Sequence, residues 1–241
     1  MTTTQPRTLA NAPMPPAVAA LPRNAQGYPI PWFVATLSDG SRDFRVASGE
    51  RWHDAVRFNK CWVCGRTYGR FMSFLIGPMC AVNRITAEPP CHYDCAVYAA
   101  LCCPFMASPQ MRRRESGRPQ EADAPAGVAI DRNPGVGLVW TTRSYRIMRV
   151  EQEAEPDGIV SVHAGKLFQL GDPTRLQWYA EGREATVAEV RESMDSGLPL
   201  LEEAADRDDN AVMARAMLAK QWVDALALLV RFGAHELETA S

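Results

Sequence analysis

Two short pairs of residues in this 241-residue chain have types and spacing that suggest metal binding. Cys61 and Cys64 form a Cys-x2-Cys pair followed by Gly65, and His92 and Cys95 form a second pair downstream. A Cys-x2-Cys-Gly sequence suits a tight knuckle, in which backbone amides point at the sulfurs and glycine takes a conformation that other residues resist. Structural zinc is held by four tetrahedral nitrogen and sulfur ligands. The sequence therefore predicts one closed zinc site formed by Cys61, Cys64, His92 and Cys95.

Other cysteines near these pairs leave the ligand set open. Cys91 could replace His92, and Cys80 or Cys103 could replace one of the assigned ligands. Four thiolates, with Cys103 in place of His92, would suit an iron–sulfur cluster. The alternative cofactor is therefore an iron–sulfur cluster, and the alternative function is a metal- or iron–sulfur-dependent enzyme that uses the cysteines.

The elements around the pairs should bring them together. Pro89 and Pro90 forbid a helix before residue 91, whereas residues 92–101 continue as one, so His92 and Cys95 fall on its first turn and face the same point. An apolar strand over residues 71–76 lies between the pairs. A knuckle, a strand pair and a helix start together predict a treble-clef-like module.

The elements expected upstream and downstream complete an α+β fold. Residues 28–37 and 43–46 predict a β-hairpin, and Ser48 caps a helix that runs to about Phe58. Strands are expected at 138–142, 145–150, 159–162, 166–170 and 176–179. The predicted class is a small treble-clef-like zinc module followed by an antiparallel β-sheet with C-terminal helices.

Two C-terminal helices are expected to close the chain. Thr186 and Glu189 form a capping-box pattern that begins the first helix, and Gly197 with Pro199 is expected to end it. An apolar stripe predicts a second helix over about 208–232, with Gly233 at its end.

Changes in composition divide the chain into four parts. Residues 1–26 are rich in Thr, Pro, Ala and Asn and are expected to be a disordered N-terminal arm. A polar stretch rich in Pro, Gly and Ala at 116–135 is expected to be a linker or long loop. The expected divisions are therefore the arm 1–26, a zinc-binding α+β module 27–115, the linker 116–135, and a β-sheet with C-terminal helices 136–241.

Charge and cysteine content narrow the class of protein. The net charge of −2 gives no global argument for nucleic acid, but residues 60–118 hold eight Lys/Arg against three Asp/Glu, and residues 181–210 hold three against ten. The seven cysteines are an odd number, and no signal peptide precedes them, which favours reduced thiols in a cytoplasmic protein. The apolar run 17–21 is too short for a membrane span.

Several short segments resemble a known group of sequences. The resemblance covers about residues 28–114, is weaker around 167–200, and is to an uncharacterised group of bacterial and phage-type proteins. The resemblance implies no activity. It does imply a phage or mobile-element origin, and it supports regarding the cysteines as one functional unit. The segments that carry it are Cys61-Trp62-Val63-Cys64-Gly65, Gly77-Pro78-Met79-Cys80, Glu88-Pro89-Pro90, His92-Tyr93-Asp94-Cys95-Ala96 and Cys103-Pro104-Phe105.

Three functional hypotheses follow. A zinc-stabilised binding or regulatory protein could contact nucleic acid through the basic 60–118 region, with phosphates bound by Arg66, Arg70, Arg112, Arg113 and Arg114. A protein partner could instead bind the acidic 181–210 segment and the last helix. The enzyme hypothesis lacks a phosphate loop, a nucleophile elbow or a His-Glu-x-x-His helix, so catalytic residues stay unassigned.

Overall fold

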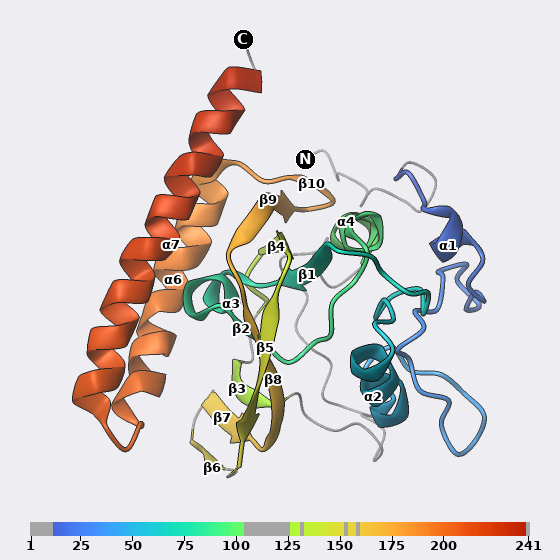
Figure 1. Cartoon of the computed structure of the whole chain (residues 1–241), viewed down its shortest axis with the longest axis horizontal. Coiled ribbons are helices and arrows are strands. Elements are labelled where there is room, and N and C mark those ends of the chain that lie inside the picture. Colours follow the sequence, from blue (N-terminus) through green and yellow to red (C-terminus); the bar gives the residue numbers. More distant parts are fainter. Residues whose placement is uncertain (1–11, 104–125, 131–132, 152–153, 158–159, 240–241) are drawn as a thin grey trace, which may run out of the picture.

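The computed structural model describes residues 12–103, 126–130, 133–151, 154–157 and 160–239 (Figure 1). Helices and antiparallel sheets make up these residues, which confirms the predicted α+β class. Within the described ranges, every helix is too short or too polar to span a membrane.

The N-terminal segment contains little regular structure but is folded against the body. Its helices are α1 (Pro16–Ala19) and α2 (Gly49–Arg57), and Ser48 caps α2 by accepting a hydrogen bond from the Arg51 amide, as expected. Residues 1–11 of the expected arm lie outside the described residues. From residue 12 onward the chain differs from a disordered arm, because Val18 is only 1% exposed and packs with the cysteines. The expected hairpin is reduced to one isolated bridge, Val34 with Ala47.

A bent two-stranded ribbon forms the framework of the fold. One side of the ribbon is β4 (Val136–Thr142) followed by β5 (Tyr145–Val150), and the other is β8 (Gly165–Leu170) followed by β9 (Pro173–Ala180). β4 pairs with β9 and β5 with β8, with a register shift at Thr141/Thr142 where the ribbon bends. The buried Thr142 hydroxyl donates to the Asp172 carbonyl at 2.9 Å, which secures the bend.

Short strands extend the two halves of this ribbon. β1 (Met72–Ile76) adds to β4 and β10 (Arg183–Glu184) adds to β9, giving the order β1-β4-β9-β10. β2 (Ile85–Thr86) adds to β8, giving β2-β8-β5. The chain passes from β1 to β2 through α3 (Pro78–Asn83), a helix that sequence reasoning missed although proline suits its first turn. Strand pairing thus joins residues before 103 to residues after 133. The expected division of the chain into a zinc-binding module, a linker and a C-terminal part stays a prediction.

A third sheet has the order β3-β7-β6. Its strands are β3 (Gly127–Ile130), β6 (Ala154–Asp157) and β7 (Val160–His163). β7 was expected, whereas β6 was not, and β3 falls in the stretch expected as a linker or long loop.

Two hydrophobic clusters lie on opposite sides of the β1-β4-β9-β10 sheet. All of β4 is buried, and its alternating side chains divide between them: Leu138 and Trp140 belong to one cluster and Val139 to the other. The helical cluster is completed by α3, α6 (Val187–Asp206) and α7 (Ala211–Thr239). Helices α6 and α7 lie side by side (Figure 1). The cysteine cluster is completed by α4 (Tyr93–Cys102) and the N-terminal segment, and its buried members include Val18, Ala55, Cys61, Trp62, Cys64, Cys91, Cys95, Ala96 and Tyr98.

The C-terminal helices begin as predicted but end later. The capping box of Thr186 and Glu189 is present, yet α6 continues through Gly197 and Pro199 to Asp206. Gly197 lies against α3, and a Cβ atom there would stand 2.4 Å from the Met79 sulfur, so this glycine permits close helix packing and does not end a helix. Similarly, α7 passes Gly233 and ends at Thr239. In α6, packing of the apolar face outweighs the unfavourable helix propensity of Gly197 and Pro199.

Candidate metal centre

The knuckle at residues 61–66 has the backbone geometry expected from its sequence. The Gly65 amide donates to the Cys61 carbonyl at 2.8 Å, and the Cys61 amide donates to the Arg66 carbonyl at 2.7 Å. Gly65 has φ +74°, and a Cβ atom there would lie 2.6 Å from the Trp32 ring. Glycine is therefore required both by the backbone conformation and by the close approach of Trp32.

Neighbouring segments hold the knuckle from two sides. The Trp32 amide donates to the Val63 carbonyl at 2.7 Å, and the Trp62 amide donates to the Pro90 carbonyl at 3.0 Å. The Phe33 and Trp62 rings are stacked with centroids 5.1 Å apart. The knuckle thus joins the N-terminal segment to the segment that leads into α4.

The second pair lies at the start of α4. His92 is the N-cap residue, and its carbonyl accepts from the Ala96 amide at 3.0 Å. Cys91 exchanges two backbone hydrogen bonds with Ser73 of β1, at 2.7 and 2.9 Å. β1 therefore sets the position of His92, and the His92 amide reaches the Cys61 sulfur at 3.3 Å.

The four predicted ligands converge in the structure. Ligand atoms of Cys61, Cys64, His92 and Cys95 all lie within 4.8 Å of one another, so this group could hold a metal ion. The His92 Nδ1 atom is 3.4 Å from the Cys64 sulfur and 3.9 Å from the Cys95 sulfur. Its Nε2 atom is 3.1 Å from the Thr67 carbonyl oxygen, a partner that sequence reasoning missed. With Nε2–H donating to that oxygen, the Nδ1 lone pair faces the sulfurs, as a metal ligand requires.

The thiols of the group share hydrogen bonds that shift their pKa values in opposite directions. Hydrogen bonds from the Cys64, Cys91 and Cys95 thiols lower the pKa of Cys61. The hydrogen bonds that these thiols make with the Cys61 sulfur, together with burial, raise the pKa of Cys64, Cys91 and Cys95. A dication among these sulfurs would favour the deprotonated form of each ligand. The donor set and its geometry thus fit a metal ion.

The alternative cysteines lie outside this group among the described residues. Cys91 is a neighbour that hydrogen-bonds to Cys61 and does not replace His92 in the convergent set. Cys80 packs beside the helical cluster, and burial raises its pKa to about 11. Cys103 is the C-cap of α4 and is likewise not in the convergent set.

Two of the predicted phosphate-binding arginines are described. Arg66 and Arg70 are exposed, and no described carboxylate lies within 4.0 Å of either guanidinium group. Arg112, Arg113 and Arg114 lie outside the described residues. Further exposed arginines lie outside the predicted phosphate-binding set. They form no run in the sequence: Arg143 lies in the turn before β5, Arg146 and Arg149 lie on β5, and Arg175 lies on β9.

An open hollow of about 580 Å³ lies between α4 and the β9–β10 strands. Its polar side chains contact one another: the Tyr93 hydroxyl donates to Gln177, and Gln177 donates to Glu184. Arg183, also in the lining, is 2.5 Å from Glu189. These groups satisfy each other, and the described lining of the hollow includes no nucleophile with an adjacent base.

Comparison with known proteins yields no match to a family model, a curated protein or a solved structure. Similarity therefore assigns no function to the chain. The geometry of the metal centre and the charges around it carry the functional argument.

Proposed function

We propose that this chain is a zinc-stabilised binding protein whose metal centre is structural. The observation that supports this most directly is the closed set of three cysteines and one histidine, with Cys61 fully buried and Cys64 and Cys95 each less than 10% exposed. Four protein ligands complete the tetrahedral shell of zinc and leave no position for a substrate. The metal would connect the knuckle to α4 and so stabilise the N-terminal half of the fold.

The knuckle and the first turn of α4 support a treble-clef-like site. The two strands between them depart from that arrangement, because β1 and β2 pair with strands of different sheets. The likeness therefore rests on the ligand-bearing elements alone.

The proposed ligand of the protein is nucleic acid, contacted through the basic 60–118 region. Exposed Arg66 and Arg70 adjoin the metal centre without a described acidic partner, and Arg112–Arg114 continue the basic character beyond it. By contrast, arginines of the α6–α7 layer such as Arg191 and Arg207 are engaged by Asp195 and Glu203. Unpaired exposed arginines are what phosphate binding needs. A phage or mobile-element origin belongs to the same proposal.

Metal content tests the structural part of the proposal. Protein purified without added metal should contain one zinc per chain and show no visible absorption. Cys64→Ser and Cys95→Ser should each lose the metal and lose stability, whereas Cys102→Ser, a buried cysteine of α4 outside the group, should keep both. Iron with broad visible absorption, or metal loss in Cys102→Ser equal to that in Cys64→Ser, would contradict it.

Salt-dependent binding tests the nucleic-acid part. Affinity for a fluorescein-labelled oligonucleotide, followed by anisotropy, should fall steeply as salt rises, and the Arg66→Ala/Arg70→Ala variant should reduce the logarithmic slope by about 1 to 2. Arg112, Arg113 and Arg114 changed together to Ala should reduce it further. The matched control is Arg191→Ala/Arg207→Ala, which removes two ion-paired arginines from the opposite layer. Absent or salt-insensitive binding would reject the nucleic-acid proposal.

A further inference from the structure

Two like charges stand directly opposite each other on the β5–β8 pair. Arg149 of β5 is the register partner of Lys166 of β8. Like charges in such cross-strand positions repel and destabilise a sheet unless an anion lies between them. No described carboxylate lies within 4.0 Å of either side chain, and the Lys166 ammonium stands over the Trp52 ring at 5.5 Å. This position concentrates positive charge beside an aromatic ring.

Apolar side chains lie on the same side of β5 as Arg149. Strand alternation places Tyr145, Ile147 and Arg149 on one side and Arg146 and Met148 on the other. The Tyr145 ring contacts the Phe168 ring with centroids 5.2 Å apart, and Phe168 contacts Trp52 at 5.4 Å. The Arg149 side therefore faces α2, and Ile147 on it remains 44% exposed.

A second cation and an exposed ring lie at the upper end of β5. Arg143 occupies the turn between β4 and β5, and its guanidinium carbon is 5.0 Å from the centroid of the Phe71 ring. Phe71 is 47% exposed. We call Phe71, Arg143, Ile147, Arg149 and Lys166 the β5 strip.

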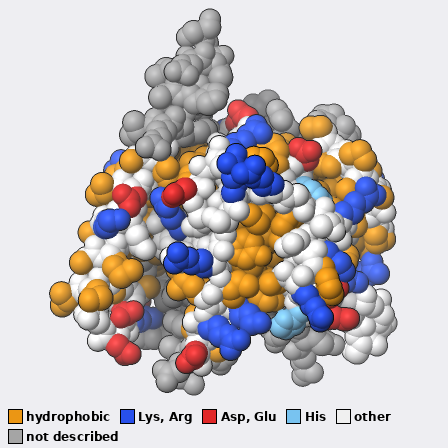
Figure 2. Space-filling model, viewed as in Figure 1, with side chains coloured by type: hydrophobic (Ala, Val, Ile, Leu, Met, Phe, Trp, Pro, Cys, Tyr) orange, Lys and Arg blue, Asp and Glu red, His pale blue; other side chains and the backbone are white. Residues whose placement is uncertain are grey.

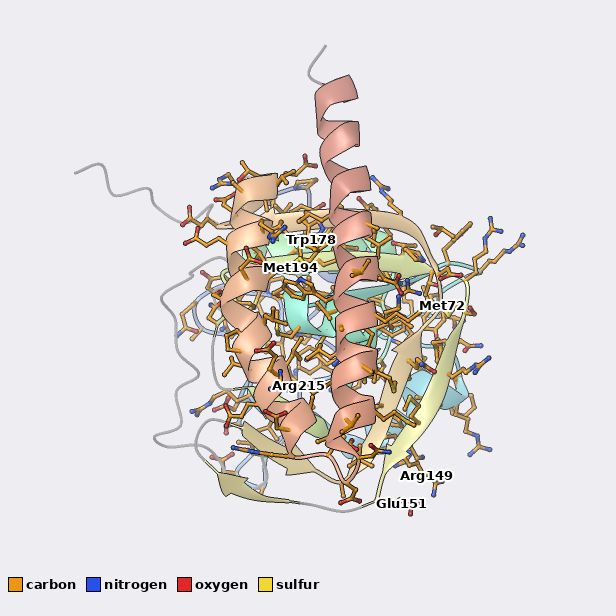
Figure 3. All side chains as sticks on the ribbon, turned by 90° about the vertical axis from the view of Figure 1, so that its left-hand side faces the viewer. Met72, Arg149, Glu151, Trp178, Met194 and Arg215 are labelled. Atoms are coloured by element: carbon orange, nitrogen blue, oxygen red, sulfur yellow. The ribbon has the colours of Figure 1, made fainter. Side chains whose placement is uncertain are left out.

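Figure 2 shows the face near whose middle β5 and β8 lie in the same view in Figure 1. In Figure 2, hydrophobic side chains gather in the middle of the face, and Lys and Arg side chains stand around them. In Figure 3, Met72 and Arg149 lie on the same side of the molecule, and Glu151 lies next to Arg149 just beyond the end of β5. An apolar centre with a basic border would suit a ligand that has both flat apolar faces and negative charges.

Single-stranded nucleic acid has those two features exposed together. Its bases present flat faces that stack on aromatic side chains, while its phosphates require cations. A duplex is usually read by an exposed helix in the major groove. Here α4, the helix at the metal centre, is buried along most of its length and carries Asp94 in its first turn. The β5 strip thus fits a single strand better than a duplex.

We propose that single-stranded nucleic acid lies along β5, with its phosphates contacted by Arg143, Arg149 and Lys166 and one base stacked on Phe71. This inference rests on the proposed nucleic-acid binding, and it adds a ligand class and residues outside the 60–118 region.

The test uses the full metal-loaded chain with two fluorescein-labelled probes, a 20-nucleotide oligothymidine strand and a 20-base-pair duplex. Anisotropy titrations at several salt concentrations should show tighter binding of the single strand. The Arg143→Ala/Arg149→Ala/Lys166→Ala variant should reduce the logarithmic salt slope by about 2, which corresponds to three phosphate contacts. Arg146→Ala is the matched control, because Arg146 is exposed on the same strand but points to the other side. It should leave the slope unchanged.

Substitutions at Phe71 separate stacking from charge. Phe71→Leu keeps an apolar side chain but removes the ring, and the affinity for oligothymidine should fall about tenfold. Phe71→Trp should retain wild-type affinity. Equal metal content in all variants would show that the fold is intact.

The outcomes distinguish the β5 site from the proposed nucleic-acid binding through the 60–118 region. If neither probe binds, both fail. If the single strand binds and Arg66→Ala/Arg70→Ala weakens it while the β5 variant matches Arg146→Ala, the β5 site is overturned and the proposed function stands. Duplex binding as tight as single-strand binding, or unchanged affinity in Phe71→Leu, would overturn the ligand class.

Discussion

The two hydrophobic clusters on either side of the β1-β4-β9-β10 sheet are stabilised by different means. The helical cluster is covered by helices of 20 and 29 residues, and large side chains such as Trp140, Phe74 and Met194 fill it. The cysteine cluster contains one helix of ten residues, α4, and is otherwise built from irregular segments, a four-residue helix and a knuckle, which backbone hydrogen bonds join. Long elements can be stabilised by burying an apolar face, whereas short irregular segments need a further constraint. A metal ion bound by the four convergent ligands would supply that constraint.

The surfaces of the two regions differ in a parallel way. On α6 and α7 the charges are paired, as in Arg215 with Asp206 at 2.6 Å, and the exposed side of α7 carries apolar residues such as Val212 and Met217. Near the knuckle Lys60 is paired with Asp54 at 2.9 Å, whereas exposed Arg66 and Arg70 and the exposed arginines of β5 have no described carboxylate within 4.0 Å. Because residues 181–210 hold ten Asp/Glu against three Lys/Arg, the charge left over in the first region is negative. The second region keeps its charge available.

Removal of one metal ligand should have the largest effect and should act on one region. Cys64→Ser leaves too few ligands for a structural site, and structural zinc contributes about 10 kcal/mol or more in small zinc domains. We expect the cysteine cluster to unfold at a lower denaturant concentration than the helical cluster, giving two transitions by tryptophan fluorescence and circular dichroism. A single transition with both signals coincident would show that the two regions do not differ in this way.

The Gly65→Ala substitution should have the next largest effect. The left-handed backbone at Gly65 costs about 1–2 kcal/mol for a residue with a side chain, and the new methyl group would overlap the Trp32 ring. We expect a loss of about 2–4 kcal/mol together with weaker metal retention during chelator titration. Gly69→Ala, where a Cβ meets no atom within 4 Å, is the control and should retain metal. Equal metal retention in both variants would show that metal binding does not depend on the knuckle conformation.

Gly197→Ala tests close packing in the helical cluster. Alanine favours a helix by about 1 kcal/mol, but its methyl group would meet the Met79 sulfur at 2.4 Å. Because the Met79 side chain is flexible, we expect a net loss of only about 1 kcal/mol in urea unfolding, with metal content unchanged. Adding Met79→Ala should reverse the sign of the Gly197→Ala effect in a double-mutant cycle. Additive losses would show that the two residues are not coupled.

Glu189→Gln should have the smallest effect. The Arg183 guanidinium, aided by the Thr186 amide and hydroxyl, lowers the pKa of Glu189 to about 2 from 4.5. A lowered pKa means that the stabilisation is complete above pH 4.5 and is lost as the pH falls towards 2. Because Arg183 is 41% exposed, we expect no more than about 1 kcal/mol at pH 7. Urea midpoints of the two proteins should converge near pH 2, and a constant difference would exclude the ionised carboxylate as the cause.

Local sequence signals predicted much of the metal centre. The Cys-x2-Cys-Gly spacing predicted the knuckle, and Pro90 before His92 predicted the helix start, because both depend on neighbours in the chain. The close contact of Trp32 with Gly65 and the Thr67 carbonyl that orients His92 were not predictable, because they depend on tertiary packing.

The difference between local signals and tertiary packing also explains which parts of the fold were predicted. Strands with clear β propensity, such as β5 and β8, were predicted near their observed bounds, and so was the capping box of α6. Pairing partners were not predicted, because β1 and β4, like β2 and β8, are far apart in the sequence. The interpretation of Gly197 as a helix end was wrong because its neighbour Met79 is distant in sequence.

Hydrogen exchange with and without a zinc chelator tests the central claim most directly. If metal stabilises the cysteine cluster, chelation should remove protection from the amides of Cys61, Gly65, Trp62 and Ala96 and leave those of β4, β9 and α6 protected. Readdition of zinc should restore the lost protection. Unchanged exchange at the knuckle after the metal has been removed, or an equal loss of protection in α6, would contradict a structural metal centre that stabilises one of the two regions.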